Sequence, residues 1–163
     1  MDLFQITLIA ATFLCSLVGG FLFAFTIVVM PGIRNLDDGE FIRAFQVMDS
    51  VIQNSQPLFM LAWVGSFLCL LLTAALSLWE PAGSYPVFIL SALLIYALGV
   101  QLPTVRINIP LNNELQALDS RSMSTHELKE ARGRFEERWV RWNTSRTVFS
   151  NLTTLLLIFL LLW

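Results

Sequence analysis

Charged residues, cysteine and histidine are all scarce in this sequence. Charged side chains make up 13% of the 163 residues, about half the share found in a typical soluble domain. Two cysteines and one histidine are too few for any metal or haem site that needs several such ligands. The net charge of −2 provides no basic field, so we expect no nucleic-acid partner.

Apolar residues are abundant instead. They account for 56% of the chain, and the mean hydropathy is +0.68. A soluble domain of this size has too little polar surface to cover such a surplus. The composition therefore excludes a soluble enzyme, a disordered chain and a collagen-like fibre, and it predicts a single integral membrane domain over residues 1–163.

Four long stretches of the sequence carry no charged residue, and each is long enough to cross a bilayer. We therefore predict an all-α fold, a four-helix transmembrane bundle with spans near residues 3–29, 57–79, 85–105 and 144–163. The last span is the shortest. It would be lengthened if Arg146 reached toward one membrane interface and Trp163 anchored the helix at the other.

The basic residues predict the orientation of the spans. All ten lie in or at the edges of two loops, residues 31–56 and 106–146, and none lies in the 80–86 loop or at either terminus. The positive-inside rule places the two basic loops in the cytoplasm and both termini outside. We expect a multi-pass protein of a bacterial inner membrane.

The first basic loop has the pattern of an amphipathic helix. Pro31-Gly32 is expected to end the first span. Asp37 then resembles an N-cap, and apolar residues follow at helical spacing, namely Phe41, Phe45, Met48 and Ile52. Their face is expected to lie on the membrane or on the mouth of the bundle.

The second basic loop predicts a long helix that continues into the fourth span. Pro103 and Pro110 disfavour a straight continuation of span three. Ser124 and Glu127 form a capping box that would begin a helix at about residues 125–163, extending into the cytoplasm. Aromatic or aliphatic residues recur there every seven positions, at Leu128, Phe135, Trp142 and Phe149.

Small residues recur every fourth position in two spans, and such stripes allow close helix packing in lipid. They are Thr12, Ser16, Gly20 and Ala24 in the first span, and Gly65, Cys69, Thr73 and Ser77 in the second. The stripes fit packing within the bundle, a homo-oligomer or a membrane partner.

One group of polar and aromatic residues is expected at the cytoplasmic mouth of the bundle: Asn108, Asn112, Trp139, Trp142, Asn143 and Arg146. Trp139, Trp142 and Arg146 are three and four residues apart, a spacing typical of one helix face. A charge at the membrane edge is by default a functional hypothesis, and these side chains suit a planar aromatic ligand that bears oxygen. An ordinary explanation also fits, because Trp and Arg are common at membrane interfaces and Asn is common beside Pro.

Three segments resemble the anthrone-oxygenase-like family of small membrane proteins. They are the run from Phe23-Ala-Phe25 to Met30-Pro31-Gly32, the run from Thr104 to Asn108-Ile-Pro-Leu-Asn112, and Trp139-x-x-Trp142-Asn143-x-x-Arg146. The resemblance implies a four-helix membrane protein. For some members it also implies oxidation of an anthrone to an anthraquinone by dioxygen, without metal or flavin.

The first functional hypothesis is therefore a cofactor-independent oxygenase that acts on a lipophilic anthrone, phenol or quinol, with dioxygen as co-substrate. Arg146 would stabilise the substrate anion, Asn108, Asn112 and Asn143 would orient it, and Trp139 and Trp142 would sandwich its rings. The sequence shows no clear base for this site, because Glu136 and Glu137 turn away from the tryptophan face.

The alternative is a non-catalytic membrane subunit, or a protein that binds a lipid or a small molecule. Its partners would be membrane lipids and a helix docked on the small-residue stripes. A transporter is less favoured, because the sequence shows neither a pair of Gly/Pro-broken spans nor a buried acidic relay.

Overall fold

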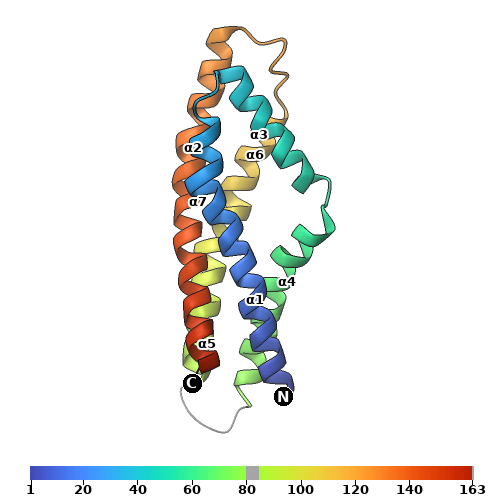
Figure 1. The fold of residues 1–163 in the computed structure, drawn as a ribbon, viewed down its shortest axis with the longest axis vertical. Coiled ribbons are helices and arrows are strands. Elements are labelled where there is room, and N and C mark those ends of the chain that lie inside the picture. Colours follow the sequence, from blue (N-terminus) through green and yellow to red (C-terminus); the bar gives the residue numbers. More distant parts are fainter. Residues whose placement is uncertain (80–84, 163) are drawn as a thin grey trace.

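The computed structural model describes residues 1–79 and 85–162, and this part of the chain is helical throughout apart from short turns (Figure 1). Four helices are long and apolar enough to cross a membrane: Leu3–Ile33, Pro57–Ser77, Pro86–Gln116 and Thr125–Leu162. The all-α four-span prediction is confirmed. Residues 80–84 of the second loop and the predicted anchor Trp163 lie outside the described residues.

The first membrane helix continues past its predicted end. It consists of α1 (Leu3–Ala24), a π-helical turn η1 (Phe25–Val29) and α2 (Met30–Ile33). The predicted end at Pro31-Gly32 falls within the last turn, and the helix ends one residue later, at Ile33. The amide of Met30 bonds the carbonyl of Phe25, five residues earlier, and this wider turn lets the proline ring clear the preceding carbonyl.

The third membrane helix contains two such π-helical turns. It runs through α5 (Tyr85–Tyr96), η2 (Ala97–Gln101), η3 (Thr104–Asn108) and α6 (Ile109–Gln116). Pro103 and Pro110 each follow a π-helical turn by two residues, as Pro31 does. The helix continues through both prolines and extends to Gln116, so the predicted end near residue 105 was wrong.

The predicted amphipathic helix is α3 (Asp38–Gln53), and its apolar face lies on the mouth of the bundle. Asp37 caps it by accepting a 2.8 Å hydrogen bond from the amide of Glu40. Phe41 and Phe45 are buried against the start of α7. The Gln46 side chain also donates to the carbonyl of Leu115 in α6 at 2.8 Å and to that of Leu118, just beyond α6, at 2.9 Å.

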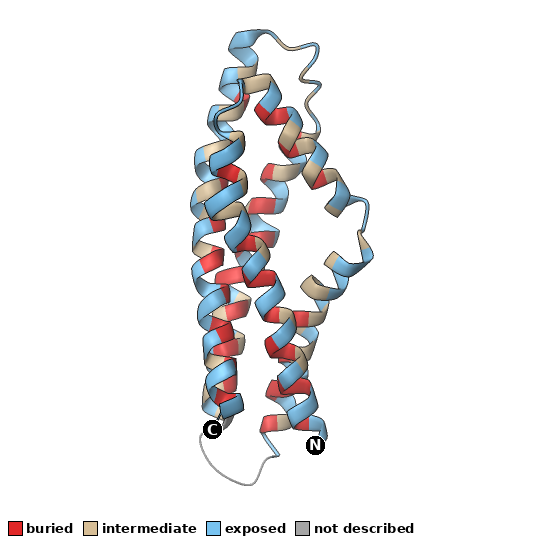
Figure 2. Ribbon diagram, viewed as in Figure 1, coloured by how far each residue is buried: buried red, intermediate tan, exposed pale blue. Residues whose placement is uncertain are grey.

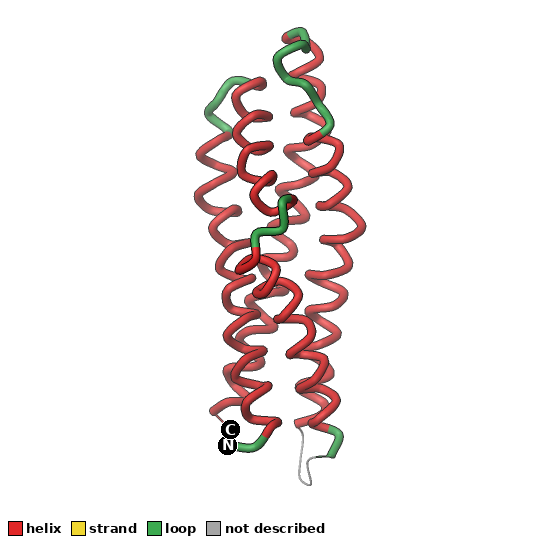
Figure 3. Tube along the Cα trace, turned by 90° about the vertical axis from the view of Figure 1, so that its right-hand side faces the viewer, coloured by secondary structure: helices red, strands yellow, loops and turns green. Residues whose placement is uncertain are grey.

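A turn at residues 54–56 joins α3 to α4 (Pro57–Ser77) part-way along the bundle rather than at its end (Figure 3). Gln56 caps α4, and Pro57 occupies its first position, where no amide hydrogen is needed. The link between α3 and α4 therefore lies on the side of the bundle and not at one of its ends.

The long fourth helix is confirmed as α7 (Thr125–Leu162), and the Ser124–Glu127 capping box is present. The seven-residue recurrence does not mark its buried face. Phe135 is buried, but Phe149 is exposed, because a seven-residue step drifts by about 20° per repeat on a straight helix. The buried face instead runs through Phe135, Trp139, Asn143, Arg146 and Ser150.

The buried residues form two clusters that hold the bundle together. Figure 2 shows that buried positions recur along the helices, with exposed positions between them. One cluster, between α1, α4, α5 and the end of α7, is built on residues such as Leu22, Leu70 and Tyr96. The other joins α3, α6 and the start of α7 around Phe45 and Trp139. A cavity lined by residues of both clusters lies where the two clusters meet.

The two small-residue stripes have different environments. In α4, Thr73 and Ser77 are buried, and a Cβ added to Gly65 would lie 3.2 Å from Leu14 of α1. In α1, Thr12 is buried, but Ser16, Gly20 and Ala24 are exposed. The α4 stripe thus packs within the bundle, whereas most of the α1 stripe faces outward.

Candidate functional site

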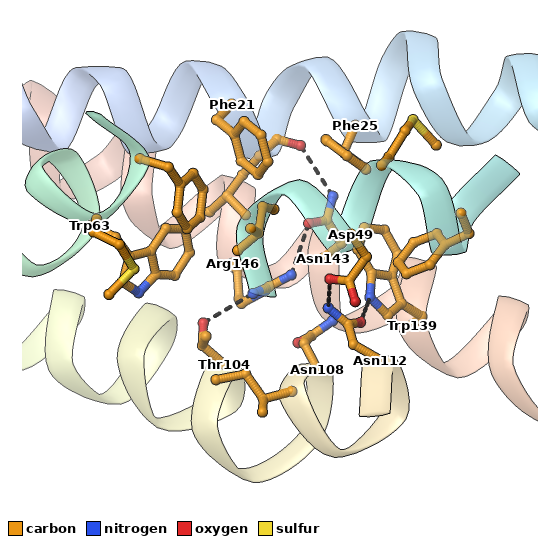
Figure 4. A pocket seen from close by; sticks show the side chains of 17 residues that line it. Phe21, Phe25, Asp49, Trp63, Thr104, Asn108, Asn112, Trp139, Asn143 and Arg146 are labelled. Atoms are coloured by element: carbon orange, nitrogen blue, oxygen red, sulfur yellow. Dashed lines mark hydrogen bonds between the residues drawn. The ribbon is translucent and has the colours of Figure 1, made fainter. Parts of the chain in front are cut away.

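A cavity of about 210 Å³ lies between the first membrane helix, the end of α3, the start of α4, the η3–α6 segment and α7 (Figure 4). Its walls are mainly apolar and include Phe21, Phe25, Phe45, Phe59, Trp63 and Trp139. A smaller set of polar side chains also lines it, namely Asp49, Thr104, Asn108, Asn112, Asn143 and Arg146. Flat apolar walls with a few converging polar groups are typical of sites for small aromatic ligands.

The π-helical turns bring several of these side chains to the cavity. Phe25 begins η1, and Thr104 and Asn108 are the first and last residues of η3. An extra residue in a helical turn rotates the side chains that follow it, and such turns are frequent at functional sites. Pro31 and Pro110 therefore each follow a π-helical turn that contributes side chains to the cavity.

The Arg146 side chain is buried at the centre of the site, with 4% of its surface exposed. Its Nη1 donates to Thr104 Oγ1 at 2.9 Å, and its Nη2 donates to Asn143 Oδ1 at 3.0 Å. Its Nε has no hydrogen-bond partner, and none of the ion pairs among the described residues includes it. A buried guanidinium with an unused donor and no carboxylate partner favours an anionic or oxygen-bearing ligand.

Asn143 fixes the position of this guanidinium. Its Nδ2 donates to the carbonyl of Leu22 at 3.1 Å and to Thr26 Oγ1 at 2.9 Å, both on the first membrane helix. These bonds orient its Oδ1 toward Arg146 Nη2. Asn143 therefore ties α7 to the first helix and holds Arg146, rather than offering its own amide to a ligand.

The Asn108 amide is the second unsatisfied group. The residue is 2% exposed, and neither its Oδ1 nor its Nδ2 has a hydrogen-bond partner. Leaving a buried polar group unpaired costs about 1–3 kcal/mol. A ligand that offers both a donor and an acceptor would recover this energy.

A carboxylate, Asp49 of α3, also lines the cavity and is 4% exposed. Its Oδ1 accepts from Asn112 Nδ2 at 2.8 Å. Its Oδ2 accepts from Gln53 at 2.7 Å and from Gln116 at 3.1 Å. Trp139 Nε1 in turn donates to Asn112 Oδ1 at 2.8 Å, which links tryptophan, amide and carboxylate in one chain.

The structure brings together five of the six residues expected at the site: Asn108, Asn112, Trp139, Asn143 and Arg146. Trp142 is half-buried and does not line the cavity, so the expected tryptophan sandwich was wrong. The reason is helical phase, because Asn143 and not Trp142 follows Trp139 on the inward face. The expectation that Arg146 reaches toward the interface was also wrong, since its side chain is buried among Thr104, Asn143 and Trp139.

The sequence interpretation missed Asp49, Thr104 and the aromatic walls contributed by α1, α3 and α4. A signal for Asp49 was present, because it lies four residues after Phe45 and therefore on the apolar face of its helix. A carboxylate on that face is unusual and indicates a buried partner. For the phenylalanines, no sequence signal separates a cavity wall from a lipid-facing position.

The cavity also opens to the outside of the bundle. Met60 and Ile109 line it, and they are 40% and 44% exposed. A cavity of about 150 Å³ in another protein holds one benzene molecule. The space here therefore takes at least one aromatic ring, and the open side leaves room for a larger molecule.

A family model described as anthrone oxygenase matches residues 45–156, more than half of the chain. The matched region includes Asp49, Asn108, Asn112, Trp139, Asn143 and Arg146, whereas the Phe23–Gly32 part of the resemblance lies outside it. The search of curated proteins and the search of solved structures gave no match. The chain belongs to the anthrone oxygenase family.

Proposed function

We propose that the protein uses dioxygen to oxidise a lipophilic aromatic compound, an anthrone, phenol or quinol, in this cavity and without a metal or flavin. The observation that carries the proposal is the buried Arg146 guanidinium, which has a free Nε and, among the described residues, no carboxylate partner, in a cavity walled by aromatic rings. Such a group is suited to an oxygen atom that gains negative charge during a reaction.

The polar groups favour a substrate with a carbonyl or hydroxyl group at one edge of a flat ring system. Arg146 Nε supplies a donor, and the Asn108 amide supplies a donor and an acceptor. The ring faces of Phe21, Phe25 and Trp63 supply apolar contact (Figure 4). Trp139 and Asn112 bond each other, so their contribution is to shape the wall.

For an anthrone, the proposed reaction converts the central methylene carbon into a carbonyl. Loss of one proton from this carbon leaves its electron pair delocalised over the rings and the existing carbonyl oxygen, next to Arg146. The carbanion reduces dioxygen and forms a carbon–oxygen bond, which gives a hydroperoxide after protonation. Loss of water then yields the anthraquinone, so one oxygen atom enters the product and the other leaves as water.

The substrate is proposed to enter from the bilayer through the opening beside Met60 and Ile109, both exposed on the outside of the bundle. The basic segments 31–56 and 106–146 are proposed to face the cytoplasm of a bacterial inner membrane, with both termini outside. The site would then lie near the cytoplasmic end of the membrane helices.

Oxygen uptake by the purified protein tests the proposal, with a panel of anthrones and quinols as substrates. We expect Arg146→Ala to lower kcat by about 10²–10³-fold, the usual effect of removing an oxyanion donor, and Arg146→Lys to retain part of the activity. Arg138→Ala is the matched control, because Arg138 is exposed two turns away on the same helix. Absence of substrate-dependent uptake across the panel, or equal rates in wild type and Arg146→Ala, would overturn the proposal.

The second candidate is a non-catalytic membrane subunit or a protein that binds a lipid or small molecule. The outward-facing part of the α1 stripe, Ser16, Gly20 and Ala24, favours it, because small residues exposed to lipid allow close approach of another helix. That helix could come from a second copy or from another membrane protein. Saturable binding of an anthrone without oxygen uptake would favour this candidate over the oxygenase.

A further inference from the structure

We propose that Asp49 is the base that removes the substrate proton. The inference rests on the proposed function and supplies the group that the sequence interpretation lacked. It assigns a catalytic role to a residue of α3, the helix that closes the mouth of the bundle. The substrate is accordingly a carbon or oxygen acid, held between a carboxylate and a guanidinium.

The position of Asp49 is the first support. Its side chain lines the same cavity as Arg146 and Asn108, and 4% of its surface is exposed. No ion pair among the described residues includes Asp49. Its three hydrogen-bond donors in the described part of the chain are neutral amides, so none of them is a cation that would weaken the carboxylate as a proton acceptor.

The hydrogen-bond count leaves one acceptor site open. An ionised carboxylate offers about four lone-pair sites, two on each oxygen. Gln53 and Gln116 both donate to Oδ2, whereas Asn112 alone donates to Oδ1. The open site is therefore on Oδ1, which is the atom we assign as the proton acceptor.

Trp139 and Asn112 position this oxygen. An indole N–H can only donate, so its 2.8 Å bond identifies the Asn112 atom facing it as the oxygen. The Asn112 NH₂ group must then face Asp49, as its 2.8 Å bond to Oδ1 requires. Asn112 and Trp139 are thus positioning residues for the base, not ligand contacts.

The proposed step balances within the cavity. The C–H bond of the substrate breaks, its proton moves to Asp49 Oδ1, and its electron pair stays on the substrate. Negative charge leaves the carboxylate and appears on the substrate oxygen beside Arg146. Figure 4 shows the Asp49 side chain next to Asn112 and Trp139, with Arg146 between them and Trp63.

A purely structural role for Asp49 predicts different behaviour. The same hydrogen bonds join α3 to α6, so loss of the carboxylate would then lower stability and every activity alike. A catalytic base instead affects proton abstraction specifically, and an external base can replace it. The test must therefore measure proton abstraction apart from oxygen chemistry and apart from folding.

Hydrogen exchange at the anthrone methylene carbon, measured by NMR in D₂O without oxygen, separates these roles. We expect the wild type to speed hydrogen exchange at this carbon above the rate in buffer alone. Asp49→Asn should lower the protein-catalysed exchange rate by about 10²–10⁴-fold, the usual contribution of a general base. Asp38→Asn is the matched control, with the same change in the same helix but outside the cavity. Asp49→Ala should regain exchange when formate is added, whereas a structural role predicts no rescue.

The outcomes separate this inference from the proposed function. Rapid exchange that depends on Asp49, without oxygen uptake, would support the base and overturn the oxidation. Oxygen uptake with undiminished exchange in Asp49→Asn would support the oxidation and overturn the base. Wild-type exchange no faster than buffer, or a folded Asp49→Ala that formate does not rescue, would also overturn the assignment of Asp49.

Discussion

The packing of Gly99 in η2 against α7 gives a sharp stability prediction. An added Cβ at Gly99 would lie 2.6 Å from Phe149 Cβ and 2.8 Å from Phe149 Cδ2, whereas carbon atoms in contact are about 3.5–4.0 Å apart. Rotation of the Phe149 ring cannot relieve the clash with its Cβ, so the two helices must separate locally. Overpacking of this kind costs about 1–3 kcal/mol, and Gly99→Ala should destabilise the protein by that amount.

Gly20 of α1 provides the matched control, because an added Cβ there meets nothing within 4 Å. Alanine is favoured over glycine inside a helix by about 0.8–1.0 kcal/mol, so Gly20→Ala should stabilise the fold or leave it unchanged. In a protein of this size, about 1 kcal/mol corresponds to a shift of about 2–4 °C in Tm. We therefore expect the two variants to move Tm in opposite directions when thermal unfolding is followed in detergent.

Gly99→Ala should also slow oxygen uptake, because η2 leads directly into Pro103 and η3, whose Thr104 accepts a bond from Arg146. A Gly99→Ala variant with wild-type Tm and activity would refute the close approach of η2 to α7. An equal fall in Tm in Gly99→Ala and Gly20→Ala would show that the loss of stability comes from replacing a helical glycine and not from the contact with Phe149.

Three further predictions concern the groups around the cavity. Trp139→Phe leaves Asn112 Oδ1 unpaired, so it should cost about 1–3 kcal/mol in thermal unfolding and slow methylene exchange; adding Asn112→Leu should cause a further loss, because it also removes the bond to Asp49 Oδ1. Arg132→Ala removes an ion pair of 3.1 Å to Asp38 and bonds to two backbone carbonyls, so it should lower the unfolding free energy by about 1–3 kcal/mol in denaturant titration without altering KM. Met60→Trp should narrow the opening of the cavity and raise KM for an anthrone with kcat unchanged, as measured by oxygen uptake.

Much of the fold could be predicted from the placement of charge alone. The uncharged stretches located the four spans, because a charged side chain is costly in hydrocarbon. The capping patterns at Asp37 and Ser124 located the starts of α3 and α7, because each supplies acceptors for unpaired amides. These features depend on residues close in sequence.

The prolines could not be interpreted correctly from sequence. A proline removes one helical hydrogen bond, and a helix responds either by ending or by widening its previous turn. Which response occurs depends on the neighbours that the continued helix contacts. Leu111 and Leu115 after Pro110 are buried in the packing around α3 and α7, and Ile33 after Pro31 is partly buried there; this packing favours continuation.

The sequence predicted most of the polar residues of the candidate site but not how they contact one another. Trp139, Asn143 and Arg146 share the inward face of α7 as helical geometry requires, and the Asn108–Asn112 segment lies opposite them. Asp49 and the aromatic walls of α1 and α4 join the site only through tertiary packing. The direction of each amide was likewise set by long-range bonds, such as that from Trp139 to Asn112.

The central claim, that the cavity carries out oxidation by dioxygen, is tested most directly by the stoichiometry of one reaction. Purified protein is incubated with anthrone while dissolved oxygen and anthraquinone are measured together. We predict one dioxygen consumed for each anthraquinone formed, without accumulation of hydrogen peroxide, at a rate far above that of the Arg146→Ala variant. Anthraquinone formation no faster than in buffer, or at the same rate in Arg146→Ala, would contradict the claim.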